Sequence, residues 1–261
     1  MSDFRTLTTP THIAESRFSI EVPDGWQQGR GAFGGFGIAT LIRAIETTEN
    51  VAERPLRSLT SELFGPLLPG PADVVVELLR RGAGMTTVAA RIIQEESVVA
   101  HAVGILARPR MDQAYNGIKA PDRKPFHELA AAPSMGPSFA QFFEYRIAGN
   151  MPFSQQPEAL VETWVRMRLP CPTADAAYIA AMADATWPAL FTTMSEPRPM
   201  GTVSYTLSLF GPFDDVRPDA PLYHRGRVLA AADGYAAETR ELWTPEGRLV
   251  SINHQTIATI R

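Results

Sequence analysis

Asp184 is the charged residue whose sequence surroundings best suit acid–base chemistry. Its neighbours three and four positions away on a helix are all apolar, namely Ala180, Ala181, Trp187 and Pro188. A carboxylate among apolar neighbours is partly desolvated, which raises its pKa and suits it to accept a proton from water. Because Asp is also a favoured N-cap, Asp184 could instead cap a turn over residues 185–191. These residues alone leave both interpretations open.

Polar side chains also interrupt two strand-like segments near the C-terminal end of the chain. From Thr202 onward every second residue is polar, which gives one wholly polar strand face made of Thr202, Ser204, Thr206 and Ser208. In the last strand-like segment, Asn253, His254 and Gln255 interrupt an otherwise apolar run. Polar strand positions of this kind either face solvent or line a site. The pattern by itself does not choose between the two for Thr202 and Gln255.

A glycine-rich segment precedes the first predicted helix. Residues 29–34 read G-x-G-x-x-G, and Gly35 continues the run. A dinucleotide site would need a parallel strand after the helix, whereas this chain continues into antiparallel strands, so we expect no nicotinamide cofactor. Glycines at a helix N-terminus also let a carbonyl oxygen approach free N–H groups, which makes Gly34 and Gly35 candidates for an oxyanion site. Close packing of the helix is the alternative role of these glycines.

Other common catalytic and metal-binding patterns do not occur in the sequence. The five histidines show no ligand spacing, so we expect no metal site. There is no G-x-S-x-G nucleophile elbow, and Cys171 stands between two prolines with no histidine near it in sequence. As the single cysteine it can form no intrachain disulfide, which favours a reducing compartment.

The 261 residues carry 24 basic and 28 acidic side chains, a net charge of −4. This balance gives no electrostatic drive towards nucleic acid or an anionic membrane. Residues 1–10 lack the apolar core of a signal peptide. The longest apolar stretch, 176–191, is interrupted by Asp184 and Pro188 and is too short to span a bilayer. We therefore expect a cytoplasmic protein that binds neither nucleic acid nor membrane.

Two stretches of the chain show the turn-separated alternation that is typical of an antiparallel meander. Strands are predicted over 17–22, 56–64, 73–80, 85–94 and 97–107, and again over 142–147, 161–169, 201–210, 223–232, 235–243 and 249–260. Each set has one predicted helix, over 36–48 and over 174–191. The nine residues from Ser58 match the nine from Ser204 at six positions, in the shared pattern S-x-T-x-x-L-F-G-P. One helix followed by a meander is therefore predicted to occur twice.

A strongly apolar helix needs a sheet on most of its sides to be buried. We therefore predict an α+β fold in which an antiparallel sheet wraps round a helix, in duplicate. Residues 109–137 are rich in proline and poor in apolar periodicity, which is typical of a linker. The expected organisation is an N-terminal half over 1–108, a linker over 109–137 and a C-terminal half over 138–261.

The duplicated helix and meander, the Phe33-Gly34-Gly35 helix start and the paired L-F-G-P strands resemble the double-hotdog acyl-CoA thioesterases of the type II, thioesterase-like group. The resemblance covers nearly the whole chain and implies a double hotdog, two tandem helix-wrapped antiparallel sheets. In that family an aspartate on the second-half helix, a threonine opening the following strand and a glutamine on the last strand hold a water molecule for attack on the thioester. The matching residues here are Asp184, Thr202 and Gln255.

The resemblance implies hydrolysis of an acyl-CoA thioester to a free acid and CoA, without a cofactor and without a covalent acyl-enzyme. Asp184 would act as the base or orienting carboxylate, and Thr202 and Gln255 would hold the water. Gly34 and Gly35 would stabilise the oxyanion. A polar trio at these places is expected in the second half alone, because the first-half counterparts of Thr202, Gln255 and Asp184 are assigned as Leu56, Gly104 and Ile38.

Aromatic residues near the two predicted helices are candidates for contacts with the acyl chain. Phe36 and Trp187, together with Phe33, could line an acyl tunnel, and ordinary core packing is the alternative for each. Hotdog proteins commonly associate through sheet edges, so a homo-oligomer is also expected.

Two other functions fit the same scaffold. One is a non-catalytic protein that binds an acyl or aromatic ligand, with the polar trio merely satisfying a buried network. The other is a dehydratase acting on a 3-hydroxyacyl thioester, which would depend on a histidine paired with a carboxylate. His254 beside Gln255 is the residue that keeps the dehydratase hypothesis open.

Overall fold

The computed structural model describes residues 2–111, 115–133 and 136–260. The strands predicted over 17–22, 85–94 and 97–107 are confirmed with the same bounds. The helix predicted over 36–48 begins and ends two residues earlier. The elements of the first half are α1 (Phe4–Thr8), β1 (Thr11–Ala14), β2 (Arg17–Val22), β3 (Gln27–Gln28), β4 (Gly31–Ala32), α2 (Gly34–Glu46), β5 (Leu56–Leu63), β6 (Gly70–Arg81), β7 (Met85–Gln94) and β8 (Ser97–Ala107).

The second half repeats the order of two strands, one long helix and four strands, and adds short 3-10 helices (η). The strand predicted over 235–243 is confirmed with the same bounds, whereas the helix predicted over 174–191 is much shorter. The elements are η1 (Phe126–Glu128), η2 (Ser138–Phe142), β9 (Phe143–Ile147), β10 (Leu160–Met167), α3 (Ala176–Asp184), η3 (Ala189–Thr193), β11 (Met200–Leu209), β12 (Leu222–Ala232), β13 (Tyr235–Trp243) and β14 (Leu249–Thr259).

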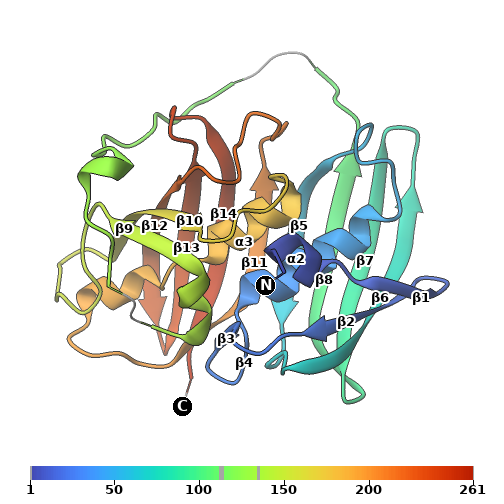
Figure 1. Ribbon diagram of the computed structural model, residues 1–261, viewed down its shortest axis with the longest axis horizontal. Helices are drawn as coiled ribbons and strands as arrows, with labels where there is room; N and C mark the ends of the chain where they lie inside the picture. The colour runs from blue at the N-terminus through green and yellow to red at the C-terminus, as the bar shows by residue number, and fades with distance from the viewer. Residues whose placement is uncertain (1, 112–114, 134–135, 261) are drawn as a thin grey trace.

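Twelve strands from both halves form one antiparallel sheet, in the order β1-β2-β6-β7-β8-β5-β11-β14-β13-β12-β10-β9. β5 and β11 pair at its centre, in a register that runs from Ser58↔Ser208 to Glu62↔Ser204. The two predicted sheets are therefore joined edge to edge, and the expected α+β class is confirmed. Figure 1 shows the strands of the first half on one side, those of the second half on the other, and α2 and α3 against the sheet.

The two long helices are buried because they are apolar all round. In α2 every residue from Gly35 to Ile45 is buried, and in α3 every residue is. A helix without a polar face must be covered on all sides, and here each covers the other. The closest approach is at Gly35, where a Cβ atom would lie 3.0 Å from the Cα of Ala181. Small residues on both helices make this separation possible.

The duplication extends to irregular details of the backbone. β5 pairs with β8 through a register shift just after Leu56, and β11 pairs with β14 through a register shift just after Thr202. The N–H of Phe64 donates to the carbonyl of Val99, and the N–H of Phe210 donates to that of Val250, both at 2.9 Å. Two halves that share a β-bulge and a closing hydrogen bond have the same local backbone.

The predicted linker, 109–137, includes residues 112–114 and 134–135, which lie outside the described residues. Part of the rest covers the sheet of the second half, where Trp164, Tyr223 and Trp243 form a separate apolar cluster. The guanidinium of Arg123 lies over the rings of Trp164 and Tyr223, and Phe126 packs against the same cluster. Among the described residues, no helix is both long and apolar enough to cross a membrane.

Candidate active site

α3 ends at Asp184 because of a proline four residues later. An α-helical residue 188 would donate its N–H to the carbonyl of residue 184, but Pro188 has no N–H and its ring clashes with that carbonyl. Asp184 is therefore the last residue of α3, and η3 begins after Pro188, which occupies its N-cap position. The expectation of one helix to residue 191 is wrong for this reason, and so is the N-cap role for Asp184.

Side chains from the sheet bind backbone carbonyl groups in the last turns of α3 and just after it. The Tyr205 hydroxyl donates to the carbonyl of Ala180 at 2.9 Å, and the Tyr145 hydroxyl donates to that of Ala185 at 2.7 Å. These bonds fix the turn that carries Asp184. Only 6 % of Asp184 is exposed.

Gln255 joins Asp184 to Thr202. The Gln255 Nε2 donates to Asp184 Oδ1 at 2.9 Å and to Asn253 Oδ1 at 2.8 Å, and the Thr202 hydroxyl donates to Gln255 Oε1 at 2.6 Å. Asn253 is itself oriented, because its Nδ2 donates to the carbonyl of Thr206 at 3.0 Å. The structure therefore brings the three predicted catalytic residues into one hydrogen-bonded chain, and each amide has its oxygen on the accepting side.

Thr202 reaches this chain from the bulged start of β11. The strand alternation predicts Thr202, Ser204 and Thr206 on one polar face, but the register shift after Thr202 changes the phase at that point. A β-bulge re-aims the side chain that precedes it. Thr202 thus turns towards Gln255, whereas Thr206 is exposed on the outer face.

The N-terminus of α2 meets the carboxylate of Asp184. A Cβ atom on Gly34 would lie 2.8 Å from Asp184 Oδ2 and 3.1 Å from Leu63 Cδ1. The backbone N–H of Gly35 lowers the pKa of the same carboxylate. The positive end of a helix favours a negative group, and Gly34 lets that group approach. Both glycines therefore lie at the site.

Arg240 and Glu238 are two charged residues at the site that the sequence analysis missed. They occupy successive inward positions of β13, and 2 % of Arg240 and 1 % of Glu238 are exposed. Arg240 Nη1 lies 3.3 Å from Asp184 Oδ1, and Arg240 Nε donates to Glu238 Oε1 at 2.7 Å. The available signal was the spacing, because both residues are in phase with the buried Ala236 and Leu242.

Burial raises the pKa of Asp184 above its ordinary value. Arg240, the hydrogen bond from Gln255 and that from Gly35 lower this pKa, and the neighbouring charge of Glu238 raises it. A carboxylate that is desolvated but partly compensated is a stronger base than an exposed one. The arrangement can therefore take a proton from a bound water molecule.

The predicted aromatic contacts lie in different surroundings. Phe36 is fully buried, with its ring 6.1 Å from the rings of Phe4 and Trp26, so it packs in the core. Trp187 is half-buried three residues after Asp184, and its ring lies 5.9 Å from that of Tyr145. Its indole Nε1 is buried and, within the described part of the chain, has no hydrogen-bond partner.

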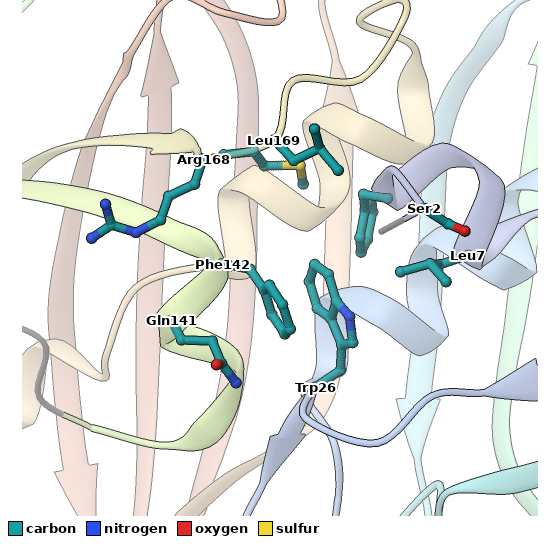
Figure 2. Close-up of a pocket in the computed structure, with 9 residues that line it drawn as sticks. Ser2, Leu7, Trp26, Gln141, Phe142, Arg168 and Leu169 are labelled. Atoms are coloured by element: carbon teal, nitrogen blue, oxygen red, sulfur yellow. The ribbon is translucent and has the colours of Figure 1, made fainter.

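A cavity of about 250 Å³ opens between α1, Trp26 and the end of β10. Figure 2 shows the rings of Trp26 and Phe142 face to face at its centre, with Arg168 pointing away from it. These two rings stack with their centroids 4.2 Å apart. The lining includes none of the predicted site residues. Phe33 packs between Trp26 and the glycines of α2, so the cavity is separated from Asp184 by an aromatic layer.

The histidine invoked for a dehydratase points away from the site. His254 is exposed on the opposite face of β14 from Gln255, and its Nδ1 lies 3.1 Å from the hydroxyl of Thr239. His224 is fully buried near Thr186, and burial together with Arg240 lowers its pKa well below the ordinary value. Neither histidine pairs with a carboxylate. Among the described residues the histidine–carboxylate pair is His101 Nδ1 with Glu62 Oε2, at 3.0 Å, and it joins β8 and β5 of the first half.

The first half carries apolar residues at the place that corresponds to the trio. A Cβ atom on Gly104 would lie 3.0 Å from both Ile45 Cγ2 and Leu56 Cδ1. Leu56 precedes the first bulge as Thr202 precedes the second, so the counterparts Leu56 and Gly104 agree with the strand registers. The expected helix counterpart Ile38 is wrong, because it lies one turn from the start of α2, whereas Asp184 is the last residue of α3. Ile45, near the end of α2, takes the place of Asp184.

Comparisons with known proteins agree with this architecture. The family model described as the acyl-CoA thioesterase N-terminal domain matches residues 22–107, and the model described as the acyl-CoA thioesterase C-terminal domain matches residues 118–259. A conserved protein of unknown function with a hot dog fold from Alicyclobacillus acidocaldarius is similar over 100 % of this chain and 99 % of its own, with 20 % identity and a TM-score of 0.91. No curated protein gives a match.

Two solved structures with names that refer to an activity are also similar. The tesB protein of Mycobacterium avium subs paratuberculosis covers 99 % of this chain and 98 % of its own, with 16 % identity and a TM-score of 0.82. An acyl-CoA thioesterase II from Mycobacterium marinum covers 99 % and 98 %, with 19 % identity and a TM-score of 0.73. At these identities the structures establish the shared fold, and the expected double hotdog is confirmed.

Proposed function

The chain belongs to the acyl-CoA thioesterase family, whose members are thioester hydrolases, and we propose that it hydrolyses its acyl-CoA by direct attack of a water molecule that Asp184 activates. The observation that carries this proposal is the chain of hydrogen bonds from Asp184 through Gln255 to Thr202, next to the N-terminus of α2. It puts a desolvated base, a fixed hydroxyl and the positive end of a helix dipole in one place.

The water molecule would be held by Asp184 and Thr202. Gln255 and Arg240 both bind Asp184 Oδ1, which leaves Oδ2 to accept a proton. Thr202 gives its own hydroxyl hydrogen to Gln255, so its oxygen can accept the second hydrogen of the water. Held at both hydrogens, the water oxygen presents a lone pair to the thioester carbonyl carbon.

The role of Gln255 is then to align the other two residues. Both hydrogens of its amide are used, one by Asp184 and one by Asn253. Gln255 therefore orients the base and the hydroxyl and does not need to touch the water through its N–H groups. Asn253 fixes the orientation of the Gln255 amide. It belongs to the polar cluster of residues 253–255 in the last strand.

The reaction proceeds through a tetrahedral intermediate. As the new carbon–oxygen bond forms, the water proton passes to Asp184 Oδ2 and the carbonyl electron pair moves onto its oxygen. The N-terminus of α2 faces this region, and the N–H of Gly34, at the first position of the helix, has no intrahelical acceptor. Collapse of the intermediate breaks the carbon–sulfur bond, and the CoA sulfur takes up the proton, which regenerates Asp184.

The substitution Asp184→Asn tests this proposal. It keeps the shape of the side chain but removes the base, and thiol release from acyl-CoA should fall at least about 10²-fold. Because burial raises the pKa of Asp184, the fold itself favours a neutral side chain at this position. We therefore expect the variant to fold. Asp214→Asn, on an exposed segment, is the matched control and should keep full activity.

The assay would use short, medium, long and aromatic acyl-CoAs, with binding measured in parallel. Lost turnover with retained acyl-CoA binding in Asp184→Asn supports the proposal. Equal turnover in both proteins would leave a thioesterase but overturn the role of Asp184. Binding without turnover of any substrate by the native protein would instead favour the non-catalytic binding protein.

A further inference from the structure

Two buried charges lie behind Asp184, on the inward face of β13. Strand pairing places Glu238 opposite Gln255 and Arg240 opposite Asn253. In the first half, the corresponding pairs are Val88 with Gly104 and Ala90 with Ala102, all apolar or small. Burying a charge costs free energy unless it is paired. The charged pair is therefore specific to the half that holds the polar trio.

Arg240 and Glu238 form hydrogen bonds to residues on both sides of the turn that follows Asp184. Arg240 Nη1 lies 3.3 Å from Asp184 Oδ1 and 3.4 Å from the carbonyl of Ala183. Glu238 Oε2 accepts a hydrogen bond of 2.8 Å from the N–H of Ala189, on the far side of Pro188. One guanidinium thus serves two carboxylates, and the two ends of the segment 183–189 are tied to one strand.

We propose that Arg240 and Glu238 are positioning residues for the hydrolysis: Arg240 holds Asp184 oriented and ionised, and Glu238 anchors Arg240 while weakening that hold by sharing its charge. This inference rests on the proposed role of Asp184. Truncating either member of a buried ion pair leaves its partner without a compensating charge. The two charges also act on the pKa of Asp184 in opposite directions, because Arg240 favours the ionised carboxylate and Glu238 disfavours it.

Among the residues that the structure describes, the other groups that face Asp184 bring no further full charge. They are the phenols of Tyr145 on β9 and Tyr205 on β11, the amide of Gln255 on β14, the N–H of Gly35 on α2 and, behind Arg240, the buried His224 on β12. Burial raises the pKa of both phenols and lowers that of His224, so all three are neutral near pH 7. Arg240 and Glu238 are therefore the charges that set the ionisation of Asp184.

The test is the acid limb of the pH profile of kcat/KM, which reports the ionisation of the free enzyme. In Glu238→Gln, Arg240 acts on Asp184 alone, so the acid limb should move to lower pH. In the double variant Glu238→Gln/Arg240→Met, no compensating charge is left, and the limb should move above that of the native protein by about one pH unit. Arg240→Lys keeps the charge and should leave the limb close to the native position.

The double variant replaces the ion pair by neutral residues of similar size, which buried sites commonly tolerate. Near-ultraviolet circular dichroism checks that each variant keeps its tertiary packing. Shifts in opposite directions support the inference, since a merely structural pair would change kcat or stability without moving the limb. Unmoved limbs, or shifts in the same direction, would overturn it. Asp184→Asn is measured alongside: full activity in that variant would overturn the proposed role of Asp184, on which this inference rests.

Discussion

The two ends of the α2–α3 pair have the same backbone and opposite chemistry. At the end of α3, Asp184, Gln255 and Thr202 form a polar chain, whereas at the end of α2 the corresponding positions hold Ile45, Gly104 and Leu56. The same bulge follows Thr202 in β11 and Leu56 in β5. The fold therefore supplies two equivalent places for a site, and three side chains make one of them polar.

The difference continues one layer deeper into the sheet. Behind the polar trio lie Glu238 and Arg240, and behind its apolar counterpart lie Val88 and Ala90. A desolvated carboxylate needs a compensating charge, and an apolar trio needs none. A polar site on this scaffold thus requires at least two sets of substitutions, one at the helix end and strand starts and one on the neighbouring strand.

Among the substitutions that test this difference between the helix ends, the largest loss of activity is expected at Gly34. A Cβ atom there would lie 2.8 Å from Asp184 Oδ2, so Gly34→Ala must push the carboxylate away from its hydrogen-bonded position. A misplacement of about 1 Å in a catalytic group costs about 10²-fold in rate. We expect thiol release to fall by that amount.

Gly37→Ala is the matched control on the same helix. A Cβ atom at Gly37 would lie 3.7 Å from Leu67 and 3.8 Å from Ile92, which is ordinary contact. This variant should gain a few tenths of a kcal/mol to about 1 kcal/mol of stability from helix propensity and keep native activity. Equal activity in both variants would show that Gly34 is not needed for the approach of Asp184.

A loss of stability is expected at the apolar end of the helix pair, where Gly104 occupies the position that corresponds to Gln255. A Cβ atom on Gly104 would press against Ile45 and Leu56, each at 3.0 Å. Overpacking a well-filled core costs about 1–3 kcal/mol, so Gly104→Ala should lower the free energy of unfolding by about 2 kcal/mol in urea titrations. Activity per folded molecule should stay native, because the polar trio is at the other end of the helix pair.

Gly84→Ala provides the control for that measurement. No atom lies within 4 Å of a Cβ at Gly84, in the turn between β6 and β7, so we expect no loss of stability. If Gly104→Ala lost activity while its unfolding stayed native, the two ends of the helix pair would be coupled in function, and the comparison between them would fail.

Most of the strands could be predicted from the sequence, because alternation and turn residues are local signals. The strands over 17–22, 85–94, 97–107 and 235–243 have their predicted bounds. The helix α1 was not predicted, since it has five residues and a single local signal, the Asp3 cap. The pairing of β5 with β11 was not predicted either, because a contact between residues about 150 positions apart leaves no trace in a short sequence window.

The members of the candidate site were found in unequal measure. The sequence surroundings of Asp184, Thr202 and Gln255 singled them out, the family resemblance gave them their expected roles, and their mutual hydrogen bonds required the fold. Glu238 and Arg240 were missed because charged residues in a strand usually face water, and only the packing shows which face is inside. The helix counterpart was misplaced at Ile38 because a fixed offset between the halves ignores η3 and the preceding turn.

The smallest expected effect is a pH-dependent change in stability at Glu46, the last residue of α2. Burial and the neighbouring Asp175 raise its pKa from 4.5 to about 7, against the lowering effect of Arg43 and Arg5. The arginines are shared, since Arg43 and Arg5 both pair with Asp175, at 2.7 Å and 3.1 Å. Like Asp184, Glu46 thus ends its helix beside cations that also pair with another carboxylate.

The sign of the resulting pH dependence follows from proton binding. Below pH 4.5 the Glu46 carboxyl is protonated in both states, and between pH 4.5 and about 7 the unfolded chain loses this proton first. The free energy of unfolding therefore falls as the pH rises through this window.

Glu46→Gln removes the effect, so at pH 8 the variant should be more stable than the native protein by about 1 kcal/mol, after allowance for screening of a half-buried group. At pH 4 the two should unfold alike in urea, and Glu53→Gln, at an exposed carboxylate, should show no such pH-dependent gain. A variant that is no more stable at pH 8 would mean that the end of α2 tolerates a charged carboxylate, and this prediction would fail.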